Sequence, residues 1–194
     1  MTTVIGDDGL ARCAWGAVDP EYRRYHDEEW GVPLHGDQPL FEKMSLEGFQ
    51  AGLSWITILR RRPGFREAFH GFDLAAVAAM TPADVDNLMH DVRIIRNRAK
   101  IEATISNARI ALELTADDPG ALDRLMWSFA PPRRESHPLD FSEVPAVTTE
   151  STAMSKSLRK LGFRFVGPTT MYALMQSSGM VDDHDAACWR ASAN

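Results

Sequence analysis

The sequence predicts an all-α fold. Apolar residues recur at helical spacing along most of the 194 residues, and no convincing stretch alternates apolar and polar residues as a strand would. Ser, Thr, Asp, Pro and Gly stand where helices would start and stop. Residues 130–147, which contain four prolines, are expected to form an extended surface loop.

The helix boundaries follow from capping signals in chain order. Asp19-Pro20 predicts a helix start, because an Asp side chain accepts hydrogen bonds from the first free N–H groups and Pro fits the first turn. That helix is expected to run to Trp30, and Ser151 is expected to cap a later one. The other expected helices span residues 38–70 with breaks near 48–52 and 63–64, then 74–80, 83–91, 94–114, 121–129, 151–161 and 168–176.

Length and composition predict a cytoplasmic globular protein. No apolar run approaches the roughly 20 residues that span a bilayer, and the acidic N-terminus carries no signal-peptide pattern. Two cysteines are too few for a disulfide scaffold. We expect residues 12–194 to form a single helical domain and residues 1–11 to be a flexible extension.

The net charge of −6 argues weakly against nucleic acid as a partner, because phosphate binding depends on local positive potential. An acidic protein can nevertheless present one basic face. Taken singly, each basic cluster is more typical of a solvated helix face. The clusters are Arg60, Arg61, Arg62 and Arg66; Arg93, Arg96, Arg98 and Lys100; and Lys156, Arg159, Lys160 and Arg164.

Residues 46–55 combine an acid, two glycines and a large aromatic residue. At 3.6 residues per turn, Glu47 falls on the same apolar face as Leu40 and Ala51, where an ionised acid is costly unless it is paired. The two glycines weaken the helix just beyond it, and Trp55 follows. The stretch indicates a ligand pocket, with a helix N-cap or a surface acid after a slightly misjudged register as the alternative.

Two cysteines and two histidines lie near the chain ends. Cys13 and His26 are close to the start, and His184 and Cys188 would point the same way if a helical turn joined them. Thiolates and imidazoles suit tetrahedral zinc, and a site closed by four such ligands would be structural. The spacing alone is weak, and buried free cysteines with ordinary histidines are the alternative.

Aromatic residues gather in the N-terminal third of the chain. Aromatic side chains at helical spacing are usually core, but their polar ends and electron-rich faces also suit a flat or cationic ligand. The residues concerned are Trp15, Tyr22, Tyr25, Trp30 and Trp55.

Residues 162–169 are expected to form a short hairpin that leads into a helix. Free N–H groups at such a turn, next to a helix N-terminus, would hold a phosphate. Lys156, Arg159 and Lys160 precede the turn, and Arg164 lies within it. A plain packing corner between two helices is equally consistent.

Taken together, several segments favour the functional interpretations over the structural alternatives. They are residues 12–16 (RCAWG), 25–31 (YHDEEWG), 46–48 (LEG), 51–55 (AGLSW), 127–129 (WSF), 162–167 (GFRFVG), and Asp183-His184 with Cys188. In this order they resemble the 3-methyladenine DNA glycosylase I family. Because the resemblance runs from about Arg12 to Cys188, it is far more specific than any single motif.

The resemblance implies an all-α fold of the helix-hairpin-helix DNA glycosylase superfamily. It implies one structural zinc per chain, which ties the two chain ends together through Cys13, His26, His184 and Cys188. It also implies that the enzyme flips N3-methyladenine out of alkylated duplex DNA and hydrolyses its glycosidic bond. The products would be an abasic site and free 3-methyladenine.

The resemblance also assigns roles to residues. Tyr25 and Trp55 would hold the flipped base between them, surrounded by Trp15, Tyr22 and Trp30, and Glu47 would contact it. The hairpin departs from the commonest Gly-x-Gly form, with Phe165 at the first glycine position, and Asp182 and Asp183 are not assigned a catalytic role. The expected DNA contacts are Gly52, Leu53, Lys156, Arg159, Lys160, Gly162, Arg164, Gly167 and Thr169.

Chemistry is compatible with these roles. N3-alkylated adenine carries positive charge, so its glycosidic bond is already weak and its recognition is most of the task. A cationic ring gains about 1–2 kcal/mol from aromatic faces, and we hypothesise that Gly52-Leu53 wedges into the base stack. No lysine is placed as an obvious Schiff-base nucleophile, so we expect a monofunctional enzyme without lyase activity. We also expect a monomer that does not contact membranes.

Two other classes of function compete with this hypothesis. A non-enzymatic, zinc-stabilised module that senses damaged DNA would bind the lesion without releasing base. A small-molecule pocket protein unrelated to DNA would show no salt-dependent DNA binding.

Overall fold

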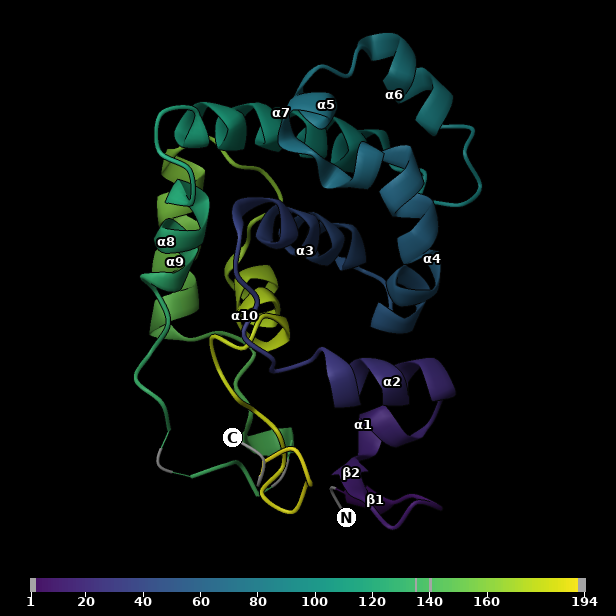
Figure 1. The fold of residues 1–194 in the computed structure, drawn as a ribbon, viewed down its shortest axis with the longest axis vertical. Helices are drawn as coiled ribbons and strands as arrows, with labels where there is room; N and C mark the ends of the chain where they lie inside the picture. Colours follow the sequence, from purple (N-terminus) through teal and green to yellow (C-terminus); the bar gives the residue numbers. More distant parts are fainter. Residues whose placement is uncertain (1–2, 135, 140, 192–194) are drawn as a thin grey trace.

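Helices form most of the structure (Figure 1), a computed structural model that describes residues 3–134, 136–139 and 141–191. The prediction of a helical fold is therefore confirmed. The α-helices are α1 (Ala14–Ala17), α2 (Pro20–Glu28), α3 (Asp37–Gln50), α4 (Trp55–Ala68), α5 (Leu74–Ala78), α6 (Pro82–Leu88), α7 (Arg98–Thr115), α8 (Ala121–Trp127), α9 (Thr149–Lys160) and α10 (Pro168–Ser177), with short 3-10 turns η1 (His70–Phe72) and η2 (Phe141–Glu143).

Two short strands precede the helices, so the prediction that the chain has no strand is wrong. Strand β1 (Thr3–Ile5) pairs antiparallel with β2 (Ala11–Cys13). Strands of three residues are too short to show a period-2 pattern, but Asp8-Gly9 is a hairpin-turn signal, and Gly9 has a φ of +77°. Met1 and Thr2 lie outside the described residues, and the flexibility of residues 1–11 stays a prediction.

Side-chain capping explains the starts of five of the ten α-helices in the described residues. The Asp19 side chain accepts a 2.9 Å hydrogen bond from the N–H of Glu21, which confirms the predicted start of α2. For α9 the predicted cap is wrong: Thr148 is the N-cap, and Ser151 is its reciprocal partner three residues later. Likewise α7 begins at Arg98 rather than Ile94, because the Asn97 side chain caps it.

The break predicted at Pro63-Gly64 does not occur, and α4 runs through both residues. Ile58 and Phe65 are fully buried on either side, so packing of the helix outweighs the hydrogen bond that Pro63 removes. Gly64 is needed here, since a Cβ atom at this position would lie 2.6 Å from the Cβ of Arg93. The break predicted near residues 48–52 is real, because α3 ends at Gln50.

Helix α3 occupies the middle of the structure, where it packs against α4, α7, α8 and α10 (Figure 1). Its side chains Leu40, Phe41 and Phe49 are buried in the main hydrophobic core. Burial of each such side chain contributes about 1.5–3 kcal/mol to the free energy of unfolding. No helix among the described residues is long and apolar enough to cross a membrane.

Candidate functional site

The predicted aromatic residues and the predicted acid line one cavity of about 270 Å³ where α2, α3, α4 and α10 meet. The structure thus brings together side chains from three separate stretches of the chain. Residues that the sequence did not indicate complete the lining, most of them from α10. The lining consists of Trp15, Tyr22, Tyr25, Trp30, Glu47, Gln50, Trp55, Ala173, Gln176 and Ser177.

Tyr25 and Trp55 touch each other rather than forming a parallel slot. Their ring centroids are 5.5 Å apart and the planes are inclined by 47°. A flat base between them would need a centroid separation of about 7 Å, since stacked carbon atoms approach to about 3.5 Å. The two rings therefore form adjacent walls in this structure, and a base could lie between them only if the two rings moved apart.

The other aromatic residues support these walls. Trp15 meets Tyr22 and Trp30 edge-on, with centroids 5.7 and 5.0 Å away. The hydroxyl of Tyr22 accepts a 3.0 Å hydrogen bond from the N–H of Ile56, which fixes the start of α4. Tyr22 thus places Trp55, the first residue of α4, as well as lining the cavity.

Glu47 points into the protein as its helical phase predicted. It is only 4% exposed, and Leu40 on the same face is fully buried, whereas Ala51 lies beyond the helix end and is exposed. The Ser177 hydroxyl donates a 2.9 Å hydrogen bond to Glu47 Oε1. Burial raises the pKa of Glu47 to about 7, against the opposing effects of Lys43 and Ser177. The carboxyl group therefore changes charge in the physiological range.

Lys43 is a buried cation beside this site that the sequence did not single out. It lies one turn before Glu47 on α3 and is 8% exposed. Its Nζ is 5.0 Å from the centre of the Tyr25 ring and 6.0 Å from that of Trp55. Burial lowers the pKa of Lys43, and the charge of Glu47 opposes that shift. A Lys four residues before a buried acid could have been noticed as an i, i+4 pair.

Three of the four predicted metal ligands converge. Donor atoms of Cys13, His26 and Cys188 all lie within 4.8 Å of one another, and His26 Nε2 is 3.4 Å from Cys188 Sγ. The fourth, His184, lies beside them with its ring centroid 5.0 Å from that of His26. No helical turn joins His184 and Cys188, which are both described in the structure: the backbone forms an irregular loop closed by a 2.7 Å bond from Cys188 N to Asp185 O.

The chemistry of the four side chains fits a tetrahedral metal ion. His184 Nε2 is buried with no hydrogen-bond partner in the described part of the chain. The Nδ1 atoms of His26 and His184 lie 2.8 and 2.7 Å from carboxylates of Asp27 and Asp182, an arrangement that leaves each Nε2 to the metal. The hydrogen bond from the Cys13 thiol lowers the pKa of Cys188 and raises the pKa of Cys13, and a bound metal ion would favour the thiolate form of both.

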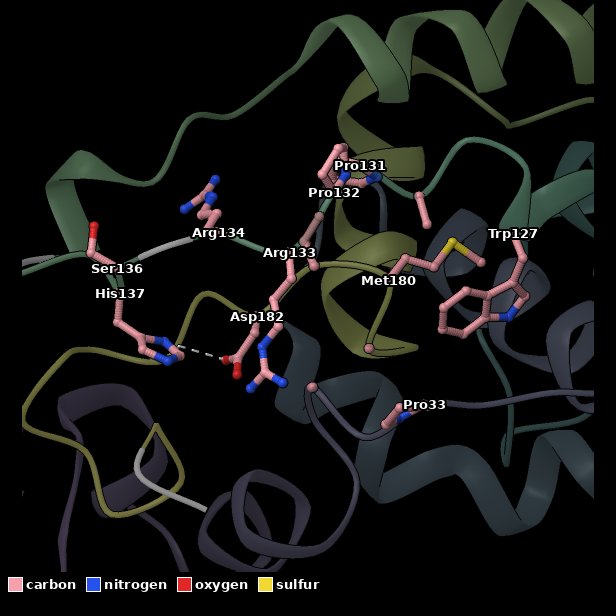
Figure 2. Close-up of a pocket in the computed structure, with 14 residues that line it drawn as sticks. Pro33, Trp127, Pro131, Pro132, Arg133, Arg134, Ser136, His137, Met180 and Asp182 are labelled. Atoms are coloured by element: carbon pink, nitrogen blue, oxygen red, sulfur yellow. Dashed lines mark ion pairs between the residues drawn. The ribbon is translucent and has the colours of Figure 1, made fainter. Parts of the chain in front are cut away.

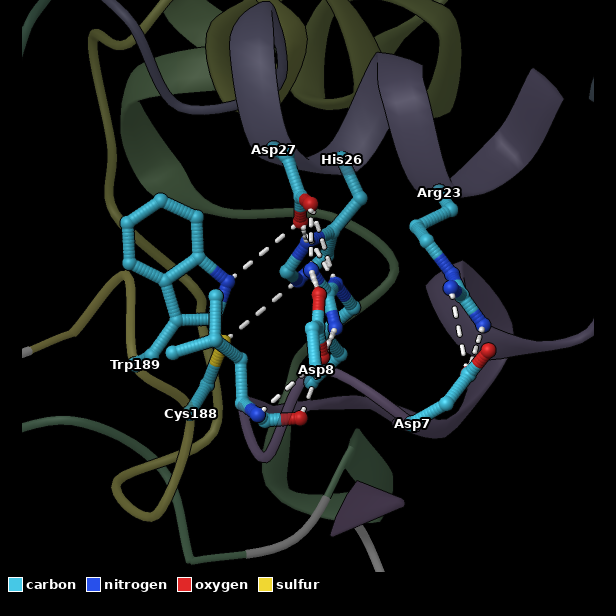
Figure 3. Close-up of polar contacts among 9 residues, drawn as sticks. Asp7, Asp8, Arg23, His26, Asp27, Cys188 and Trp189 are labelled. Carbon is cyan, nitrogen blue, oxygen red and sulfur yellow. Dashed lines mark hydrogen bonds and ion pairs between the residues drawn. The ribbon is translucent and has the colours of Figure 1, made fainter. Parts of the chain in front are cut away.

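The N-terminal hairpin is tied to this cluster (Figure 3). The buried guanidinium of Arg12 binds Asp8 at 2.6 Å and Asp27 at 2.8 Å, and Asp27 in turn faces His26. Trp189 Nε1 donates to Asp27 from the C-terminal segment at 3.3 Å. One carboxylate thus joins both chain ends to His26.

The three basic clusters differ in how their charges are used. In the first two clusters, carboxylates bind several arginines: Arg62 pairs with Glu29, and Arg98 with Asp86 at 2.5 Å. In the third cluster all four side chains are exposed, and among the described residues they form no salt bridge. The third cluster is therefore the one of the three in which all four charges remain available to an anion: Lys156, Arg159, Lys160 and Arg164.

The remaining predicted DNA contacts lie at two turns. Gly52 and Leu53 are exposed in the turn between α3 and α4, and Leu53 is 40% exposed although apolar. Gly162 and Thr169 are exposed, and Gly167 half-buried, around the α9–α10 turn.

The neighbouring acids Asp182 and Asp183 both form polar contacts with other side chains. Asp183 is 1% exposed and is bound by Tyr172 at 2.6 Å, by Gln176 at 2.9 Å and by Arg134 at 2.7 Å. Asp182 lies 2.7 Å from His184 Nδ1. Neither acid lines the aromatic cavity, which is consistent with the absence of a predicted catalytic role for both.

A second cavity, of about 280 Å³, lies between the proline-rich loop and the segment after α10 (Figure 2). Arg133, Arg134 and Asp182 border it, and Asp182 lies 3.8 Å from Nδ1 of His137. No residue predicted to bind the base or DNA lines this cavity. It is therefore separate from the aromatic cavity.

Comparison with known proteins places the chain among DNA glycosylases. The family model described as methyladenine glycosylase matches residues 15–191. DNA-3-methyladenine glycosylase 1 of Escherichia coli (strain K12) is 46% identical over 180 residues, which cover 92% of this chain and 96% of that protein.

Solved structures agree. A crystal structure of 3-methyladenine DNA glycosylase I (TAG) matches with a TM-score of 0.88 and 44% identity, covering 92% of this chain and 98% of that one. A second, of the enzyme from Staphylococcus aureus, concerns 3-methyladenine recognition and matches with a TM-score of 0.85 and 36% identity over 92% and 95% of the two chains. The resemblance inferred from the motifs is thereby confirmed: the chain belongs to the methyladenine glycosylase family.

Proposed function

We propose that this protein is a DNA repair glycosylase that excises 3-methyladenine from alkylated duplex DNA by hydrolysis. The observation that carries the proposal is the position of Glu47, a buried carboxyl group in the wall of an otherwise aromatic cavity. A cavity of this kind suits a flat ring with positive charge. Relatives whose names specify this activity support the choice of lesion.

In the proposed reaction the bond between C1′ and the base nitrogen breaks, and the base leaves with the bonding electrons. The cationic lesion thereby becomes neutral 3-methyladenine. Water adds its hydroxyl group to C1′ and releases a proton, which leaves an abasic site. The substrate supplies its own leaving-group charge, so the protein needs no strong general acid.

Glu47 recognises the base in this proposal. As a carboxylate it attracts the cationic ring and accepts hydrogen bonds from its edge, and these bonds are strong because the acceptor is charged. Tyr25 and Trp55 provide the aromatic surface. Normal adenine is rejected because it lacks the charge and has a stronger glycosidic bond.

The DNA-facing side is formed by two turns in the proposal. The α9–α10 turn acts as the hairpin of a helix-hairpin-helix element, and its unpaired cations neutralise phosphates. Gly52 and Leu53 open the base stack. Lys43 does not line the cavity, which supports the expectation that no lysine forms a Schiff base and that the strand is not cleaved.

A metal ion bound by Cys13, His26, His184 and Cys188 would be a structural zinc in this proposal. It would supply cross-links between the two ends of the chain rather than chemistry at the base. We expect one zinc per chain in a cytoplasmic monomer.

Base release tests the proposal. The protein is incubated with methylated duplex DNA, and the free bases are separated by chromatography. Release of 3-methyladenine by the wild-type protein and its loss in Glu47→Ala, with the fold retained by circular dichroism, are expected. Binding of damaged DNA without any base release would instead favour the damage-sensor alternative.

A further inference from the structure

Helix α7 carries a polar stripe on its buried face. Lys100, Thr104 and Asn107 follow one another at helical spacing, and each is less than a tenth exposed. Burying an ammonium group and a carboxamide is unfavourable unless their hydrogen bonds are satisfied. The partners of these side chains therefore indicate what the stripe does.

Lys100 binds the end of α3. Its Nζ donates to the carbonyl oxygens of Phe49 at 2.9 Å and Ala51 at 2.8 Å. The last carbonyls of a helix have no partner within the helix, and a cation there also interacts favourably with the helix dipole. Because Ala51 is followed directly by Gly52 and Leu53, Lys100 fixes the point from which the α3–α4 turn projects.

Asn107 binds the other turn in the same way. Its Nδ2 donates to the carbonyl of Arg164 at 3.0 Å, and its Oδ1 accepts from the N–H of Arg164 at 2.8 Å. The α9–α10 turn is thereby held to α7 through its backbone, while the Arg164 side chain stays exposed.

Phe165, in the α9–α10 turn, lies close to both Lys100 and α3. It adopts a φ of +57°, and its ring centre lies 6.0 Å from Lys100 Nζ. It packs close to α3, because a Cβ atom at Gly48 would lie 3.4 Å from the Cβ of Phe165. Thr104 differs from its two neighbours on the stripe, since its hydroxyl bonds only the carbonyl of Lys100 in its own helix, at 3.0 Å.

From these contacts we infer that Lys100 and Asn107 are positioning residues that set the distance between the α3–α4 turn and the α9–α10 turn. The inference rests on the proposed function, in which one turn opens the base stack and the other grips the backbone. Both actions must occur on the same duplex at once, so their relative placement decides whether the lesion is extruded. A displacement of about 1 Å is enough to lower a rate about 100-fold.

The variants Lys100→Met and Asn107→Leu test the inference, with Thr104→Val as the matched control on the same stripe. Single-turnover excision from methylated duplex should fall about 10- to 100-fold in the first two variants. In a duplex that carries a non-cleavable analogue of 3-methyladenine beside 2-aminopurine, the fluorescence rise that reports base extrusion should shrink in parallel. Affinity for free 3-methyladenine should stay within about twofold of wild type in all three, since the aromatic cavity is untouched.

Two results would overturn the inference while leaving the proposed function intact. One is wild-type excision and extrusion in both Lys100→Met and Asn107→Leu. The other is a loss of affinity for free 3-methyladenine and of thermal stability in Lys100→Met and Asn107→Leu that matches their loss of excision. Such a result would mean that the stripe merely supports the fold. If the wild-type protein itself released no base, the proposed function would fail, and this inference with it.

Discussion

Lys43 and Glu47, one turn apart on α3, are opposite charges that are both buried beside the aromatic cavity. Burial disfavours the charged form of each group, and each favours the charged form of the other. The pair therefore controls whether Glu47 is ionised near neutral pH, when it would have to attract a cationic base.

Lys43→Met should shift the pH dependence of excision. Without the ammonium group the pKa of Glu47 rises above its present value of about 7. The acidic limb of the rate profile, which follows ionisation of Glu47, should then move to higher pH by about one unit. Single-turnover rates between about pH 5.5 and 9 measure the shift. Lys43→Arg, which keeps the charge, is the control, and an unmoved acidic limb in Lys43→Met would count against the role of Glu47 as a charged reader.

Glu47→Gln should stabilise the protein at high pH while it lowers excision. The pKa of Glu47 is higher in the folded protein, about 7, than its ordinary value of 4.5. The folded state therefore binds the proton more tightly, and the free energy of unfolding decreases as pH rises from about 4.5 to about 7. Removing this group should add about 2–3 kcal/mol at about pH 8.5 and almost nothing at about pH 4.5.

Urea denaturation at the two pH values measures this difference. Glu113→Gln, on an exposed part of α7, is the control and should show no comparable gain at the higher pH. Equal stability of Glu47→Gln and wild type at both pH values would mean that ionised Glu47 is better solvated than its burial indicates.

The sequence predicted those parts of the site that follow from the spacing of apolar residues along a single helix. Glu47 was found because one helical phase places it with Leu40 on a buried face. The resemblance, rather than spacing, brought Cys13 and Cys188 together, because no local rule relates residues at opposite ends of a chain. Spacing could not decide the backbone at His184 for the same reason, because contacts with distant segments, such as the 2.8 Å hydrogen bond from Trp189 N to Ala11 O, fix that loop.

Residues that act through contacts between distant segments of the chain left no signal in the sequence. Ser177 was not predicted because its bond to Glu47 joins α10 to α3. Lys100 was assigned to a solvated basic cluster, but it is buried and bonded to carbonyl groups. Periodicity distinguishes apolar from polar faces, and a polar residue on a buried face appears only as an interruption of the pattern.

Replacing Lys156, Arg159 and Arg164 together by Ala should weaken DNA binding and reduce its salt dependence. For every phosphate that is no longer neutralised, the slope of log K against log salt concentration should become shallower by about 0.9. Fluorescence anisotropy with undamaged duplex between about 50 and 200 mM salt measures the slope. Arg98→Ala is the control, because Asp86 binds that side chain at 2.5 Å. An unchanged slope in the triple variant would place the DNA on another face.

Loss of the carboxylate behind His26 should weaken metal retention. Asp27 lies 2.8 Å from His26 Nδ1 and is itself held by Arg12 at 2.8 Å. Changes to groups that orient a metal-bound histidine typically lower metal affinity about 10- to 100-fold. We expect this range for Asp27→Asn, and a smaller loss in the same direction for Asp8→Asn, because Asp8 acts on Asp27 only through Arg12.

Zinc transfer to a chromogenic chelator measures the effect on the purified protein, and the absorption of a cobalt-substituted sample reports whether two thiolates remain bound. Asp7→Asn is the matched control, because Asp7 neighbours Asp8 but has a 90% exposed side chain, and its ion-pair partner in the described part of the chain is Arg23, at 3.4 Å. A wild-type protein without zinc would refute the metal site itself. Equal zinc transfer from Asp8→Asn, Asp7→Asn and wild type would show instead that the N-terminal hairpin only covers the site, since the charge that holds Arg12 would then be dispensable for the ligand histidine.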